Sequence, residues 1–288
     1  PPGGGNPVSY GAVQGELVWP SSQEFQKGTW DNVPAPLANE ERVAYVLFST
    51  TNRTQKFSTP SAQSAVREDS PGALGYGFQV SYSPGNRTMY ALAGILDLGS
   101  GDFTAYAMGY VKGVAIFPNA QTGSVVIPMD HALDQALLLE VSPPPSGPKG
   151  PDRLNARVVV EFAQRSYGIL PAMQKTPLIP LSGPVSFVGL PPIDDDLTGA
   201  RYVASAEAVT GPSLSAPTSV VRAFATTTTS LPVQVEGFVA VPLLVTPAVN
   251  GSWDGRHLAV DYPPGGFPAD LTVYEISAGG GLMRWLVA

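Results

Sequence analysis

Few side chains in this sequence could carry out acid–base or metal chemistry. The 288 residues include no cysteine and only two histidines, His131 and His257. A catalytic triad needs a histidine beside a nucleophile and a carboxylate, and the chain has no Gly-x-Ser-x-Gly nucleophile elbow. The lack of cysteine and of paired histidines at ligand spacing excludes thiolate chemistry and the common zinc motifs. We therefore expect both histidines to be polar surface residues, and we expect no cofactor.

Three carboxylates are candidates for sugar chemistry. Glycosidases place two carboxylates about 5–10 Å apart, so Asp97, Asp102 and Glu161 allow the hypothesis of a β-sandwich glycoside hydrolase. A simpler interpretation of Asp97 and Asp102 is a hairpin, because the segment Gly99-Ser100-Gly101 between them supplies turn conformations.

A run of three further carboxylates, Asp194, Asp195 and Asp196, is a weak candidate for a Ca²⁺ site, since it concentrates hard oxygen ligands. The run lacks the ligand spacing and the turn glycine of an EF-hand loop. We expect a solvated turn there and no metal site.

Aromatic residues cluster between positions 75 and 110, where they indicate either packing or a recognition surface. Tyrosine offers a large contact area together with a hydroxyl group, which suits recognition. Polar residues that could hydrogen-bond a sugar lie nearby in the sequence. The candidate residues for binding a receptor or glycan are Tyr82, Asn86, Arg87, Tyr90 and Asp102.

The elements that position these residues must be strands. The chain contains 30 prolines and 31 glycines, which would interrupt almost any long helix. Short β-branched and aromatic runs recur between turn signals, as in 42–48, 110–117, 136–141, 156–162 and 185–190. We predict an all-β fold, an antiparallel sandwich or barrel. At most one short helix is expected, starting at 128–135 with Asp130 as its N-cap; the alternative for this stretch is loop plus strand.

Charge and hydropathy exclude several classes of partner. The net charge is −7, which argues against nucleic-acid binding, and no apolar run is long enough to span a membrane. The first residues have neither the basic nor the apolar region of an intact signal peptide. Three glycosylation sequons begin at Asn52, Asn86 and Asn250, and the sequence leaves open whether they carry glycan.

Proline-rich segments suggest the domain organisation. Residues 1–8 are expected to be a hinge, and 191–196 a seam within the chain. A weak similarity between 178–187 and 266–274 leaves open whether 197–288 forms a second similar subdomain.

Several segments resemble the protruding domain of calicivirus-like capsid proteins. They are 136–141 (ALLLEV), 155–170, 180–189 (PLSGPVSFVG) and 255–276, preceded by a PPGGG start that resembles a hinge between shell and spike. The order of the segments differs from that of the family, and they carry no invariant motif. The resemblance implies a P1-like platform over 9–55 and 130–288 and an inserted, outer P2-like subdomain over 56–129.

The resemblance also implies a function. It predicts a capsid spike that is displayed on the virion surface after assembly in the host cytoplasm, forms homodimers, attaches to a host receptor or glycan, and is not an enzyme. Two alternatives stay open: a secreted carbohydrate-binding or adhesin β-sandwich, and the glycoside hydrolase considered above.

Overall fold

The computed structural model describes most of the first 238 residues and parts of the remainder. The described residues are 9–21, 30–68, 76–145, 151–163, 165–171, 173–175, 183–194, 197–209, 218–238, 243–246, 252, 254, 257, 259–261, 272–278 and 281–287. They form strands and turns together with the 3-10 turn η1 (Ala62–Ser64), so the predicted all-β class is confirmed. Within these ranges there is no helix of the length and apolarity needed to cross a membrane. The predicted hinge at 1–8 lies outside them.

The centre of the fold is a five-stranded antiparallel sheet in the order β3-β2-β5-β6-β8. Its strands are β2 (Glu40–Phe48), β3 (Val66–Arg67), β5 (Gly85–Asp97), β6 (Phe103–Ile116) and β8 (His131–Ala132). Alternate residues of β2 enter two different cores: Val43 and Tyr45 on one face, Ala44 and Val46 on the other. Because both faces are covered, this strand is a continuous apolar run.

One face of the central sheet packs against a three-stranded sheet in the order β4-β1-β7. Its strands are β1 (Gly11–Val18), β4 (Tyr76–Tyr82) and β7 (Gln121–Pro128). Strand β1 pairs antiparallel with β4 and parallel with β7. The rings of Trp19 and Trp30 lie 4.6 Å apart and both meet Tyr76 edge-on, which contributes a large apolar area to this core.

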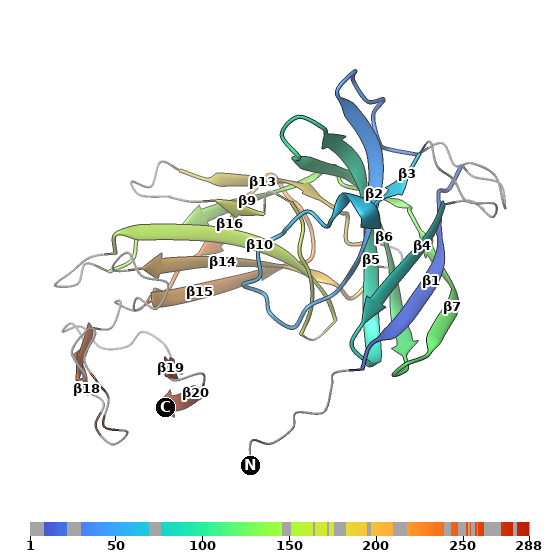
Figure 1. Cartoon of the computed structure of the whole chain (residues 1–288). Helices are drawn as coiled ribbons and strands as arrows, with labels where there is room; N and C mark the ends of the chain where they lie inside the picture. The colour runs from blue at the N-terminus through green and yellow to red at the C-terminus, as the bar shows by residue number, and fades with distance from the viewer. Residues whose placement is uncertain are drawn as a thin grey trace, which may run out of the picture.

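The opposite face packs against two sheets from the second half of the chain (Figure 1). The first sheet has the order β11-β10-β14-β15, and β12 also pairs with β10. Its strands are β10 (Arg153–Ala163), β11 (Ser166–Gly168), β12 (Gln174–Lys175), β14 (Arg201–Val209) and β15 (Thr218–Ala225). The second has the order β13-β9-β16, formed by β9 (Gln135–Val141), β13 (Val185–Leu190) and β16 (Val233–Val235). Apolar residues of all these layers share one core with the central sheet.

Two hairpins follow in the last part of the chain. They are β17 (Leu243–Thr246) with β18 (Ala259–Asp261), and β19 (Thr272–Ala278) with β20 (Gly281–Val287), both antiparallel.

The strand pairing differs from the predicted division into a platform and an inserted subdomain. Strands β1 and β2, expected in the platform, pair with β4, β5 and β7 from the expected insertion. Within the described residues, strands β1–β8 pair among themselves and β9–β16 among themselves, so the sheets divide near residue 133. The reason is burial: β2 is apolar on both faces and needs β5 beside it to complete the central sheet.

The predicted seam and helix are also corrected. Leu190 and Leu197, on either side of 191–196, belong to the same core, and the Tyr202 hydroxyl donates to the carbonyl of Pro191 at 2.5 Å. The stretch expected to start a helix forms β8 and β9 instead, as the loop-plus-strand alternative proposed. In β9 the buried residues Leu137, Leu139 and Val141 recur at every second position, which is the period of a strand.

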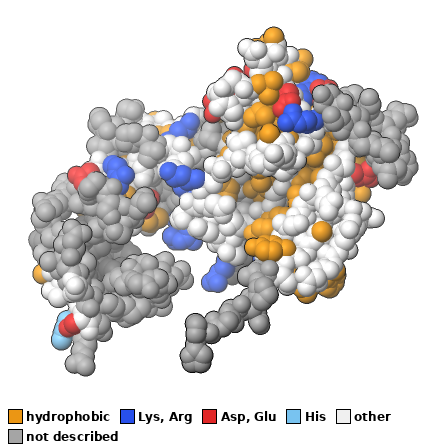
Figure 2. Space-filling model, viewed as in Figure 1, with side chains coloured by type: hydrophobic (Ala, Val, Ile, Leu, Met, Phe, Trp, Pro, Cys, Tyr) orange, Lys and Arg blue, Asp and Glu red, His pale blue; other side chains and the backbone are white. Residues whose placement is uncertain are grey.

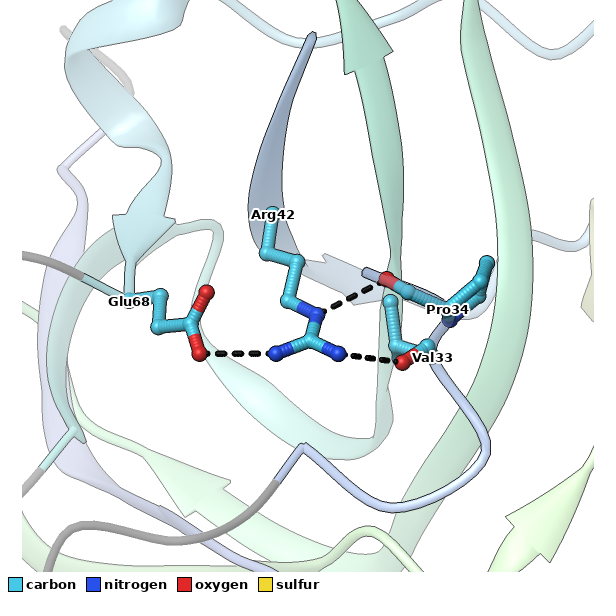
Figure 3. Close-up of polar contacts among 4 residues, drawn as sticks. All are labelled: Val33, Pro34, Arg42 and Glu68. Atoms are coloured by element: carbon cyan, nitrogen blue, oxygen red, sulfur yellow. Dashed lines mark hydrogen bonds and ion pairs between the residues drawn. The ribbon is translucent and has the colours of Figure 1, made fainter. Parts of the chain in front are cut away.

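An arginine on the central sheet fixes the connection that leads into it. The Arg42 guanidinium donates to the carbonyls of Val33 and Pro34 and to the Glu68 carboxylate, each at 2.8 Å (Figure 3). All three of its nitrogens are therefore used within the fold. Such an arginine has a structural role and is not available to a ligand.

Candidate functional site

A polar cavity lies where the two halves of the fold meet. Its volume is about 320 Å³, within the usual range of ligand sites. The residues after β2, the start of β5, the last part of β6 and the turn between β10 and β11 contribute to it. The lining residues are Ser49, Thr50, Thr51, Asn86, Arg87, Thr88, Gly113, Arg165 and Ser166.

Backbone and hydroxyl hydrogen bonds join the two halves at this cavity. Thr50 and Tyr167 form an isolated antiparallel bridge, with N–H···O distances of 3.0 and 2.8 Å. The Ser166 hydroxyl donates to the Ser49 hydroxyl at 2.8 Å. These bonds place β11 against the residues that follow β2, so one wall of the cavity comes from each half of the chain.

Arg87 is held in place by an aromatic stack. Its guanidinium carbon lies 5.4 Å from the centroid of the Tyr82 ring, which stacks on Phe48 at 4.2 Å. Nη2 of Arg87 donates to the Ser83 hydroxyl at 3.0 Å and to the Pro84 carbonyl at 3.2 Å, while Nε is buried without a hydrogen bond. A stacked guanidinium is pre-organised, because less side-chain entropy is lost when it binds a ligand.

Arg165 occupies the turn between β10 and β11 and is held there through its backbone. Its φ of 60° lies in the left-handed region. Its backbone N–H donates to Oε1 of Glu161 at 3.0 Å, and the Arg201 Nε donates to Oε2 of the same carboxylate at 2.5 Å. The Glu161 carboxylate thus fixes the turn, while the Arg165 guanidinium makes no ion pair or hydrogen bond with the residues that the structure describes.

The environment of Glu161 keeps it charged. Burial alone would raise the pKa of this carboxyl, but hydrogen bonds from Arg201 and the Arg165 N–H, the Arg201 charge and the Tyr167 hydroxyl together lower it. Its exposed fraction is 4%, and both of its oxygens have partners. Glu161 is therefore a structural carboxylate, unlike the accessible acid that the hydrolase hypothesis requires.

The structure brings together three of the five sequence-predicted binding residues. Tyr82, Asn86 and Arg87 lie at or beside the cavity, with Asn86 exposed on its wall. Asp102 is exposed at a different, mainly apolar cavity of about 670 Å³ between β6 and β10. Tyr90 is 3% exposed and belongs to the core, so its assignment as a receptor contact is wrong: both faces of β5 are covered there, with Tyr90 in one core and Met89 in the other.

The buried hydroxyl of Tyr90 has a structural role that can be tested. It donates to the carbonyl of Ile169 and accepts from the Ile169 N–H, both at 3.1 Å, and burial raises its pKa, which keeps it protonated. We expect Tyr90→Phe to lower the free energy of unfolding by about 1–2 kcal/mol, because two buried backbone groups lose their partner. Urea denaturation measures this; Tyr10→Phe, at an exposed tyrosine, is the control and should leave stability unchanged.

The remaining acidic and histidine candidates have local structural roles. The Asp97 carboxylate accepts hydrogen bonds from the N–H groups of Gly99 and Ser100 at 2.7 and 2.8 Å. These bonds lower the pKa of Asp97, and the bond from Ser100 has the larger effect. The predicted hairpin is confirmed by the pairing of β5 with β6. His131 is 4% exposed rather than a surface residue, because β8 places it against β6. The exposed His257 contacts Asp254 at 2.7 Å.

A metal site is not apparent in the part of the chain that the structure covers. No group of three His, Asp or Glu side chains there could hold a metal ion. Asp194 is exposed, and its carbonyl accepts from the Leu197 N–H in a turn. Asp195 and Asp196 lie outside the described residues.

Comparisons with protein-family models, curated proteins and solved structures found no match to this chain. The function is therefore argued from the cavity and its residues.

Proposed function

We propose that this protein is a non-catalytic attachment domain, the protruding domain of a small non-enveloped virus capsid, which binds a cell-surface glycan in the cavity between Arg87 and Arg165. The observation that carries the proposal is the lining of this cavity. It presents hydroxyl groups, one amide and two guanidinium groups. Such groups match the hydroxyl-rich surface of a sugar, which both donates and accepts hydrogen bonds.

The shape of the site favours binding over catalysis. Among the residues that the structure describes, no carboxylate lines this cavity, so these residues do not supply the paired acids that glycoside hydrolysis requires. The residues around it come from strands and a tight turn, which suits a site that must keep its geometry without a moving lid.

The assignment to a capsid is supported by the resemblance of residues 136–141, 155–170 and 180–189 to the protruding domain. A secreted adhesin would use the same cavity in the same way. The reading frame upstream of Pro1 distinguishes the two: a basic arm followed by a jelly-roll shell indicates a capsid, and a signal peptide indicates an adhesin. Light scattering at micromolar concentration tests the homodimer that the capsid assignment predicts.

Filling the cavity is expected to abolish glycan binding. Asn86 is exposed on β5 and lines the cavity, so Asn86→Trp places a bulky ring there while keeping a residue that strands accept. On a panel of neutral and acidic glycans, we expect the natural chain to bind a subset and Asn86→Trp to lose all of it. Lys56→Ala, at the other cavity, is the control and should bind normally. Equal binding by Asn86→Trp, or no binding by the natural chain, would contradict the proposed function.

A further inference from the structure

We infer that the glycan in this cavity carries a negatively charged group, a carboxylate or a sulfate, held between Arg87 and Arg165. This inference rests on the proposed function and adds the chemical class of the ligand. Its basis is the charge of the lining, the unused donors of the two arginines, and the way in which the fold fixes both of them.

The cavity is positive in a chain that is acidic overall. The sequence has 23 acidic against 16 basic residues, yet the described residues of the lining include two arginines and no Asp or Glu. On the face shown in Figure 2, both acidic and basic side chains reach the surface. Two like charges around one small cavity repel each other, and an anion between them removes that repulsion.

Other arginines show how this fold uses a guanidinium for structure. Arg42 and Arg67 pair with Glu68 and Glu41, and Arg201 pairs with Glu161. Arg157 donates to the carbonyls of residues 53 and 55 and to the Gln174 side chain. In contrast to these arginines, Arg165 lines a cavity, and its guanidinium pairs with none of the residues that the structure describes.

The donors of Arg87 also point to an anion. Its Nη2 is used by Ser83 and Pro84 and its Nε is buried, while Nη1 has no partner among the described residues. Hydrogen bonds from guanidinium to carboxylate or sulfate oxygens are shorter and stronger than those to neutral oxygens. The Thr51 and Thr88 hydroxyls and the Asn86 amide, for which the described residues provide no hydrogen bond, remain for the neutral part of the sugar.

The fold positions the Arg87 side chain and the Arg165 backbone independently of any ligand. Arg87 is stacked on Tyr82, and the Arg165 turn is fixed by the Glu161 carboxylate. Each comes from a different half of the chain, and the bridge between Thr50 and Tyr167 sets how they face the cavity. The Arg87 guanidinium is therefore pre-organised, and the Arg165 guanidinium has its donors available, an arrangement that favours a charged oxygen group over a neutral one.

The test compares matched acidic and neutral glycans. The probes are 3′- and 6′-sialyllactose, 3′-sulfated lactose and unmodified lactose, together with sialylated, sulfated and neutral members of a larger array. The sialyl and sulfated arms distinguish a carboxylate from a sulfate. We expect the natural chain to prefer acidic members about tenfold or more over their neutral counterparts, and added salt to reduce that preference.

Variants of Arg165 separate charge from structure. Arg165→Asn removes the charge but suits the left-handed turn, so it should fold normally and lose about tenfold to hundredfold in affinity for the acidic glycan. Arg165→Lys keeps the charge and should retain part of the affinity, and Lys56→Ala should retain all of it. Thermal unfolding of each variant verifies folding.

The outcomes distinguish the two proposals. Equal binding of acidic and neutral glycans, or an unchanged preference in Arg165→Asn, would overturn the inference and leave the glycan-binding function standing. Binding of no glycan by the natural chain would overturn both. Loss of acidic glycans alone in Arg165→Asn, with loss of all glycans in Asn86→Trp, would support both.

Discussion

Replacing Phe162 by alanine is expected to lower the free energy of unfolding by about 3–5 kcal/mol, the largest effect among the variants considered. Phe162 lies on β10, is 1% exposed, and stacks on Tyr110 at 5.2 Å while its ring also contacts Tyr90 at 5.6 Å. These partners belong to the central sheet, so the ring joins the two halves of the fold. The backbone of Gly168 packs so closely on it that an added Cβ would lie 2.6 Å from the ring.

Urea denaturation of the purified chain measures this loss. Phe117→Ala is the matched control, because Phe117 is 60% exposed and its replacement should change stability by less than about 0.5 kcal/mol. A loss of similar size in both variants would show that Phe162 does not join the halves. We also expect Phe162→Ala to weaken glycan binding, since β10 carries the turn of Arg165.

Replacing Glu161 by glutamine is expected to cost about 2–4 kcal/mol at neutral pH. The side chain keeps its shape, but its new amide group is a donor and faces either the Arg201 Nε or the Arg165 N–H, both of which are donors. One hydrogen bond is lost and Arg201 is left without its counter-charge. Because Arg201 is partly exposed, water solvates it and limits the cost.

The cost should depend on pH in a defined direction. The pKa of Glu161 is lower in the folded chain than its ordinary value of 4.5, so the unfolded chain binds the proton more tightly. The stabilisation is therefore complete well above pH 4.5 and is lost as the pH falls through the folded pKa. The difference in unfolding free energy between the natural chain and Glu161→Gln should shrink over that acid range.

Denaturation at several pH values tests this prediction. Glu140→Gln is the control: Glu140 is exposed and accepts one hydrogen bond from Gln234, so its loss should be less than about 1 kcal/mol. A pH-independent difference for Glu161→Gln would contradict the ion pair as its cause. Reduced affinity for acidic glycans in the same variant would agree with a positioning role for Glu161 toward Arg165.

Much of the fold class could be predicted because strand signals are local. Runs such as 42–48 and 185–190 are rich in β-branched and aromatic residues and lie between turn signals, and both form strands. Strands β5, β14 and β15 were not predicted. Alanine and glycine weaken the strand signal of β5, and alanine weakens that of β14. In β5 the glycine is required by packing: a Cβ on Gly94 would lie 1.9 Å from the Thr104 carbonyl oxygen. Such a contact with a neighbouring strand leaves no signature in the sequence itself.

The strand pairing across the expected boundaries could not be predicted, for a related reason. Proline-rich segments mark exposed connections, but they do not say which strands pair across them. That choice depends on which apolar faces fit together, as β2 and β5 do between two cores. Pairing of this kind is non-local, and no run of residues in one strand specifies its partner.

The same distinction applies to the candidate site. Tyr82, Asn86 and Arg87 are close in the sequence, so local composition indicated these three residues of the site. Whether a residue of β5 faces the cavity or the core was decided by the tertiary structure, which buries Tyr90 and exposes Asn86. Arg165 and Ser166 reach the other wall only through the bridge between Thr50 and Tyr167. The sequence by itself determined an all-β chain with few catalytic groups; only tertiary packing decided that two distant arginines share one cavity, because backbone pairing between the halves places them there.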